Sequence, residues 1–266
     1  TKVFAGSGLI LVMLLVSSAV TVLGLLSVQT NFSDYRGLAR ATNAVSSVES
    51  ELLYARLGVK DFILKGTKEA AAAVRERASA AKSALGTAVT LSSDPEAKTV
   101  IQKAEGQVAQ YEGAFGEIVQ LRAEQDTLVA KLNDAGPQTE ESLTAIMQIA
   151  NRDADAVTTY KTGQALRYLL LARLYANRFL VENEQEQIDR VNSEMASLEK
   201  IAREIGNGNL VAEQRSQFDR LNAQVKIYRD TFAAIGQLVA KRNGIVSAQL
   251  DKIGPMVAKS LEDVKA

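Results

Sequence analysis

The chain contains two copies of one long unit. The segments LLYARLGVKDFIL (52–64) and LLLARLYANRFLV (169–181) place an arginine and a phenylalanine at matching positions, 117 residues apart. A second pair of segments, YEGAFGEIVQL and YRDTFAAIGQL, keeps this step. A third pair, LNDAGP from Leu132 and LDKIGP from Leu250, is 118 residues apart, so one residue is inserted before it. The repeat is much longer than the roughly 20–50 residues of common solenoid repeats.

The pattern beyond Gln29 is helical. Apolar residues alternate steps of three and four, which is typical of one buried helix face; the clearest series is Val45, Val48, Leu52, Ala55, Val59 and Phe62. Break signals, such as Asp94 before Pro95, divide the chain. We predict an all-α fold with six helices at about 31–66, 68–91, 95–150, 155–182, 185–204 and 209–266. The Gly-Pro pairs ending at Pro137 and Pro255 predict kinks inside helices.

Helix lengths suggest an architecture. At about 1.5 Å per residue, the long third helix spans roughly 85 Å, which nearly equals the first two helices placed end to end. Two copies would then supply four helices at every height. We therefore predict two stacked four-helix bundles. The membrane-proximal bundle takes about 31–66, 119–150, 155–182 and 237–266, and the distal bundle takes about 68–91, 95–118, 185–204 and 209–236.

The N-terminal segment favours a membrane anchor. No charged residue occurs from Val3 to Gln29. A helix needs about 20 apolar residues to cross a bilayer core, whereas the apolar core of a signal peptide is about 7–15 residues long. We predict one transmembrane helix in residues 1–29, with residues 30–266 outside the cytoplasm.

The composition excludes several classes of function. The chain has no net charge, no histidine and no cysteine. This removes disulfides, thiolate nucleophiles, histidine relays, the usual zinc ligands and bulk electrostatic attraction to nucleic acid. No phosphate-binding loop or nucleophile motif is present. We expect no enzyme activity, no catalytic residue, no cofactor, no metal and no nucleic-acid partner.

These features together resemble a known family. One apolar anchor, six helices in two stacked bundles and the LLYAR and LLLAR segments resemble the helical bimodular sensor domain of bacterial chemoreceptors, over residues 30–266. The resemblance implies a periplasmic ligand-binding domain of a methyl-accepting chemotaxis receptor in the bacterial inner membrane. Its ligands would be small organic acids, either tricarboxylic-acid-cycle intermediates or acetate. Its cytoplasmic partners would be a coupling protein and a histidine kinase, reached through a further C-terminal part.

Other properties of such a receptor stay open. We expect a homodimer across the proximal bundle, because a single transmembrane helix can report a movement only relative to a partner. Two alternatives remain: the same domain on a membrane histidine kinase, and a membrane-anchored helical scaffold with no small ligand.

Arginines are the candidate ligand-binding residues, because a guanidinium holds a carboxylate with two hydrogen bonds. Arg56 and Arg173 directly follow alanines of the predicted buried helix faces, at equivalent places in the two copies. The resemblance matches them to the first and fourth helices of the family and adds Arg242 on the sixth, with Ser247 as a nearby hydroxyl. It also places Leu53 where the best-known carboxylate receptor has another arginine.

A structural role for these arginines is the competing interpretation. Glu49 and Glu51 are the rival partners that would make Arg56 and Arg173 simple salt bridges. The repeated aromatic residues are expected to pack in the core, and these are Tyr111, Phe115, Tyr228 and Phe232. Other arginines, such as Arg75, are expected on solvated faces.

Overall fold

The described part of the protein consists of helices joined by short turns. The computed structural model describes residues 2–265, without the side chains of residues 2–16 and of a few positions near both ends. Within these residues there are seven α-helices and one π-helical turn, and no strand, so the predicted all-α class is confirmed. The elements are α1 (Lys2–Lys65), α2 (Lys68–Leu91), α3 (Pro95–Arg152), α4 (Ala156–Glu182), α5 (Gln185–Gly206), α6 (Ala212–Ile245), η1 (Val246–Leu250) and α7 (Asp251–Lys265).

Two predicted boundaries differ from the observed ones. The predicted sixth helix is divided into α6, η1 and α7, whereas α3 and α7 continue past Pro137 and Pro255. The apolar N-terminal segment is not separate, because α1 includes both this segment and the predicted first helix. In the part of the chain that the structure describes, no helix is long and apolar enough to cross a membrane. Thr1 and the side chains of residues 2–16 lie outside that part, and the transmembrane helix at 1–29 stays a prediction.

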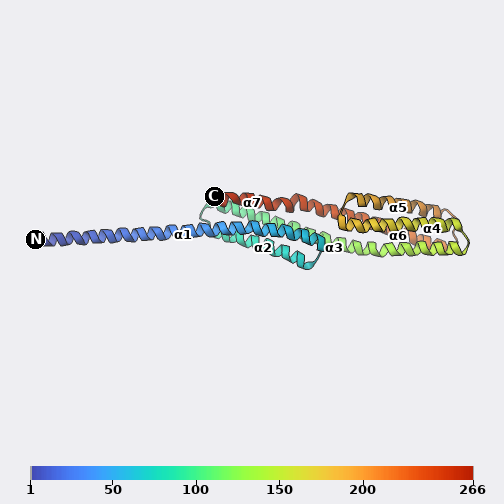
Figure 1. Cartoon of the computed structure of the whole chain (residues 1–266), viewed down its shortest axis with the longest axis horizontal. Helices are drawn as coiled ribbons and strands as arrows, with labels where there is room; N and C mark the ends of the chain where they lie inside the picture. The colour runs from blue at the N-terminus through green and yellow to red at the C-terminus, as the bar shows by residue number, and fades with distance from the viewer. Residues whose placement is uncertain (1, 266) are drawn as a thin grey trace. The chain divides into compact units, whose positions relative to one another are not determined.

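The helices form two compact units (Figure 1). Unit 1 contains residues 1–116 and 247–266, and therefore α1, α2, the first part of α3, and α7. Unit 2 contains residues 117–246, and therefore the rest of α3, α4, α5 and α6. Each unit thus combines three helical segments of one copy with the last segment of the other copy.

This grouping differs from the predicted bundles. In unit 1, α2 and α7 both pack along α1, whereas the prediction set α2 end to end with α1 (Figure 1). In unit 2, α5 packs along α4 in the same way. The expected proximal bundle would have united α1 with α4, but they belong to different units. The helix lengths allowed either arrangement, and the turns decide between them.

Both hairpin turns reverse the chain through a left-handed residue. Gly66 has φ 66° and Asn183 has φ 56°, and the backbone N–H of each donates to the carbonyl four residues earlier. Such αL residues end a helix and redirect the chain. Thr67 then caps α2 by accepting a hydrogen bond from the Ala70 N–H at 3.2 Å. The helix that follows such a turn folds back along the preceding helix and does not continue in the same direction.

The sequence repeat is visible in the helix limits and in the core. The ends of α1 and α4, and the starts of α2 and α5 and of α3 and α6, are all 117 residues apart. The buried residues of α5 each lie 117 positions after a buried residue of α2; they are Gln187, Val191, Met195, Leu198, Ala202 and Ile205. Phe62 meets Phe115 edge to face at 5.4 Å, and Phe179 meets Phe232 at 5.6 Å in the equivalent contact.

The inserted residue of the second copy forms the π-helical turn. The step between copies is 117 up to α6 and 118 from Leu250 onward, and η1 spans Val246–Leu250 at this point. A π-turn takes up one extra residue without breaking the helix. The buried positions Leu250, Gly254 and Leu261 therefore still match Leu132, Gly136 and Leu143.

Candidate functional site

In unit 1, one arginine crosses a helix at a glycine. A Cβ added to Gly254 of α7 would lie 3.0 Å from Cδ of Arg56, which is a tight contact, so any larger residue would require the arginine stem to shift. The Nη2 of Arg56 lies 3.6 Å from Oδ1 of Asp251, and its side chain remains 32 % exposed. Tyr111 of α3 is fully buried beside this pair. Burial raises the pKa of Tyr111, while the charge of Arg56 lowers it and that of Asp251 raises it.

Unit 2 repeats this arrangement with equivalent residues. A Cβ on Gly136 would lie 3.1 Å from Nε of Arg173 and 3.5 Å from the ring of Tyr228. Tyr228 is buried, and burial raises its pKa against the lowering effect of Arg173. Here Nη1 of Arg173 donates a hydrogen bond of 2.5 Å to Oε2 of Glu140.

The two copies keep the arginine, glycine and tyrosine but not the acid. Asp251 corresponds to Asn133 in the first copy, and Glu140 corresponds to Ala258 in the second. The ion pair in unit 1 is also the looser one. Among the described residues, Nε of Arg56 and the hydroxyl of Tyr111 are buried without a hydrogen-bond partner. Unit 1 therefore holds two polar groups that can donate to a further acceptor.

Arg242 has a different environment from the other two arginines. It is 5 % exposed, and its Nη2 donates to Oδ1 of Asn183 at 3.1 Å and to Oδ1 of Asn243 at 2.9 Å. Burial lowers its pKa, and the nearby charge of Arg122 lowers it further. Because Asn183 is the αL residue that ends α4, this arginine braces the hairpin turn. Ser247 is exposed on η1 and belongs to unit 1.

The four predicted site residues are therefore divided between the units. Arg56 and Ser247 lie in unit 1, and Arg173 and Arg242 lie in unit 2. Each arginine has a partner within its own unit. None of these partners is Glu49 or Glu51, the acids predicted from the sequence. Glu51 instead pairs with Arg77 at 3.1 Å, so the interpretation of Arg56 and Arg173 as ion-paired residues gains support with different acids.

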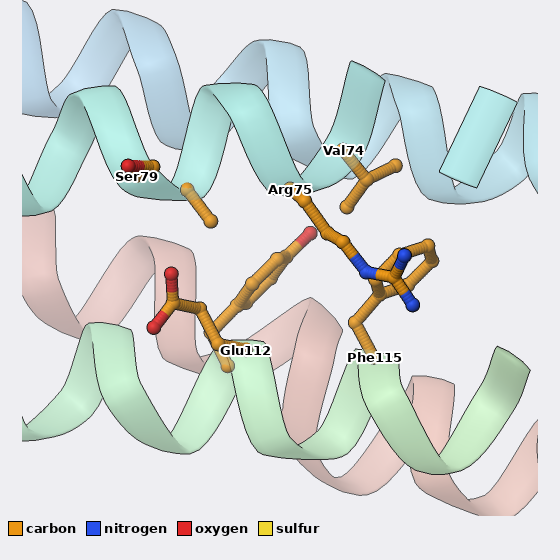
Figure 2. Close-up of a pocket in the computed structure, with 7 residues that line it drawn as sticks. Val74, Arg75, Ser79, Glu112 and Phe115 are labelled. Atoms are coloured by element: carbon orange, nitrogen blue, oxygen red, sulfur yellow. The ribbon is translucent and has the colours of Figure 1, made fainter. Parts of the chain in front are cut away.

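A cavity of about 330 Å³ opens between α2 and α3 of unit 1, and sequence reasoning missed it. Its lining consists of Val74, Arg75, Ala78, Ser79, Tyr111, Glu112 and Phe115. Figure 2 shows Arg75 reaching from α2 toward α3 and Glu112 reaching from α3 toward α2, with the Arg75 guanidinium on the side of Phe115 and the Glu112 carboxylate on the opposite side. The sequence signal that could have revealed the cavity is the small Ala78 at a core position where the second copy has Met195.

A metal site finds no support in the described part of the chain, where no three histidine, cysteine or acidic residues gather. No protein-family model matches the chain, and no curated protein matches it.

Proposed function

We propose that the chain is the ligand-binding part of a membrane-anchored receptor for small carboxylates, and that Arg56 in unit 1 is the residue that binds the acid. The observation that carries this proposal is the pair of unmet donors on Arg56 and Tyr111. A charged donor left without a partner costs free energy, and a carboxylate is the acceptor that a guanidinium binds best.

The comparison between the copies supports this role for Arg56. The arginine and its glycine occur in both units, although the neighbouring acid occupies a different helical turn in each. An arginine kept only for one salt bridge would need its acid at the matching position. In unit 2 the guanidinium is already satisfied by Glu140, so we expect Arg173 to be structural.

The continuity of α1 supports a receptor. This single helix begins at Lys2, includes the uncharged segment 3–29 and reaches Arg56 and the turn at Gly66. If residues 1–29 cross the bacterial inner membrane, a ligand at Arg56 acts on the same helix that crosses it. The chemoreceptor assignment, the periplasmic location, the homodimer and the cytoplasmic signalling partners belong to this proposal.

The test compares matched arginine variants. The 266-residue chain, purified in mild detergent, is titrated calorimetrically with acetate, succinate and citrate. Arg56→Lys keeps the charge but loses the guanidinium fork, and we expect binding to weaken by about ten- to a hundred-fold, since a charge-assisted hydrogen bond contributes about 1.5–3 kcal/mol. Arg173→Lys is the control and should leave the affinity unchanged.

Substitution of Asp251 provides an independent test. Its carboxylate lies 3.6 Å from the guanidinium and competes with a bound acid. We expect Asp251→Asn to tighten carboxylate binding by several-fold, with an accompanying gain in melting temperature when acid is added. An unchanged affinity in Arg56→Lys would contradict the role of Arg56, and no binding of any of the three acids would favour a scaffold without a small ligand.

A further inference from the structure

The cavity between α2 and α3 carries opposite charges on its two walls. Arg75 and Ser79 stand on α2, and Glu112 stands on α3 (Figure 2). The inner surface is apolar and is formed by Val74, Ala78 and Phe115. Within the described residues, neither Arg75 nor Glu112 takes part in a hydrogen bond or an ion pair. Two opposite charges on the walls of one cavity that do not pair with each other are both available to a ligand.

A buried polar group also faces this region. Tyr111 lines the cavity and is fully buried, and its hydroxyl has no hydrogen-bond partner in the described part of the chain. Buried hydroxyls are normally hydrogen-bonded, because an unmet one costs about 1–3 kcal/mol. A phenol can both donate and accept, so it can contact a carboxylate or an ammonium group.

The second copy shows how the same place looks when it is filled. The positions of Ala78 and Ser79 are taken in unit 2 by Met195 and Ala196, and Met195 is 2 % exposed. The position of Glu112 is taken by Arg229, which is bound to Glu199 and Asp230. Arg75 is replaced by the uncharged Asn192. Unit 1 alone therefore combines the small residue with the two opposite charges.

We propose that this cavity binds a free apolar amino acid. Its carboxylate would accept hydrogen bonds from Arg75, its ammonium group would donate to Glu112, and its side chain would contact Val74, Ala78 and Phe115. A volume of about 330 Å³ lies at the lower end of the range of ligand pockets, as a small metabolite requires. The cavity shares Tyr111 with the carboxylate site proposed at Arg56, but its proposed ligand differs because it needs an amine as well as an acid.

The experiment uses the whole chain in mild detergent and three probes that differ by one group. L-leucine has both charges, 4-methylpentanoate lacks the amine, and 3-methylbutylamine lacks the carboxylate. We expect saturable binding of leucine by titration calorimetry and at least about ten-fold weaker binding of each analogue, since each loses one charge-assisted contact. Valine, methionine and phenylalanine serve as further probes of the apolar wall.

Variants that introduce residues of unit 2 locate the site. Ala78→Met adds the side chain found in the second copy and should abolish leucine binding while the melting temperature stays within a few degrees. Arg75→Gln should weaken leucine binding at least about ten-fold, whereas Arg77→Gln on the same helix should not change it. Should Ala78→Met fail to fold, Glu112→Gln replaces it, and we expect this variant to bind leucine at least about ten-fold more weakly.

Three results would overturn the proposal. The first is that none of the four amino acids binds. The second is that 4-methylpentanoate binds as tightly as leucine in the Arg56→Lys variant, where the proposed acid site is weakened, which would assign the cavity's ligand to acids alone. The third is leucine binding that survives in both Arg75→Gln and Glu112→Gln. Failure of the Arg56 proposal would instead show in the titrations with acetate, succinate and citrate, and it would leave the effects of Arg75→Gln and Glu112→Gln on leucine binding unchanged.

Discussion

At the scale of single residues, the packing of arginine over glycine is the most specific feature of the two copies. The stem of Arg56 occupies the space that a side chain at position 254 would need, with 3.0 Å between Cδ and an added Cβ. The equivalent distance in unit 2 is 3.1 Å, to Nε of Arg173. Alanine is preferred over glycine within a helix by about 1 kcal/mol, so the glycine is kept at a cost to helix stability.

This packing predicts a coupling between positions 56 and 254. With Arg56 replaced by alanine, we expect Gly254→Ala to raise the free energy of unfolding by about 1 kcal/mol, because only helix propensity changes. With Arg56 present, the gain should be lost, because the arginine stem must move. A double-mutant cycle measured by urea unfolding gives the coupling. Additive effects of the two changes would show that Arg56 moves without cost.

The buried tyrosines predict a pH dependence at the alkaline end. Burial raises the pKa of Tyr111 and Tyr228 above the ordinary value of about 10. Below pH about 10 both states keep these protons, and stability is unaffected. Above it the unfolded chain releases protons that the native protein retains, so the free energy of unfolding falls as pH rises.

The measurement is urea unfolding across this range. The variant carrying both Tyr111→Phe and Tyr228→Phe should show a shallower fall than the unmodified chain. Tyr160→Phe is the control, because Tyr160 is 67 % exposed and should leave the slope unchanged. A fall of equal steepness in both variants would assign the pH dependence to other groups.

At the scale of elements, the hairpin turns decide the architecture. Gly66 and Asn183 occupy equivalent positions and adopt the same left-handed conformation, although only one of them is glycine. The asparagine turn is also held by the hydrogen bond from Arg242. The position equivalent to Arg242 in the first copy is Gln125, so the turn at Gly66 relies on the glycine itself.

A substitution at this turn tests its role. We expect Gly66→Ala to lower the free energy of unfolding by about 1–2 kcal/mol, because an L side chain is strained at φ 66°. Gly113→Ala is the matched control, since nothing lies within 4 Å of an added Cβ in the middle of α3. That control should raise the free energy of unfolding by about 1 kcal/mol. Thermal and urea unfolding of the two variants should therefore move in opposite directions.

The sequence predicted the helices better than their partners. Apolar periodicity and capping residues located the breaks to within a few residues, because both signals are local. The pairing of helices was predicted from their lengths, which cannot distinguish a helix that continues from one that folds back. Gly66 followed by Thr67 carried the missing information, since a glycine end and a threonine cap together form a reversal. Predicting the cavity would have required the comparison of Ala78 with Met195. This difference indicates a cavity only once both residues are known to be buried.

At the scale of the whole molecule, the two copies can be compared position by position because η1 absorbs the single inserted residue. Without this turn, an insertion would rotate all later residues by about 100° around the helix, since an α-helix has 3.6 residues per turn. Core residues such as Leu250 and Leu261 would then point away from their unit. The π-turn keeps them buried.

Removing one residue at this turn tests the role of η1. We expect the deletion of Ala248 to leave a folded, helical protein, because the first copy is α-helical at the same place. Deletion of the exposed Ala233 in α6 is the control, and it should lower the melting temperature sharply by rotating the buried residues that follow. Circular dichroism and thermal unfolding compare the two. Equal loss of stability would indicate that the extra residue is needed for packing.

The exchange of last segments between the copies bears on the ancestry of the protein. A polypeptide with only one copy, equivalent to about residues 30–152, would have three helical segments for one unit and a tail that belongs to another. Two such polypeptides could complete each other by swapping tails, as domain-swapped dimers do. The present chain contains the helical segments that such a dimer would have, joined end to end in one polypeptide. Unit 1 is then built from both ends of the chain and is lost when either end is removed, whereas unit 2 is the continuous segment 117–246.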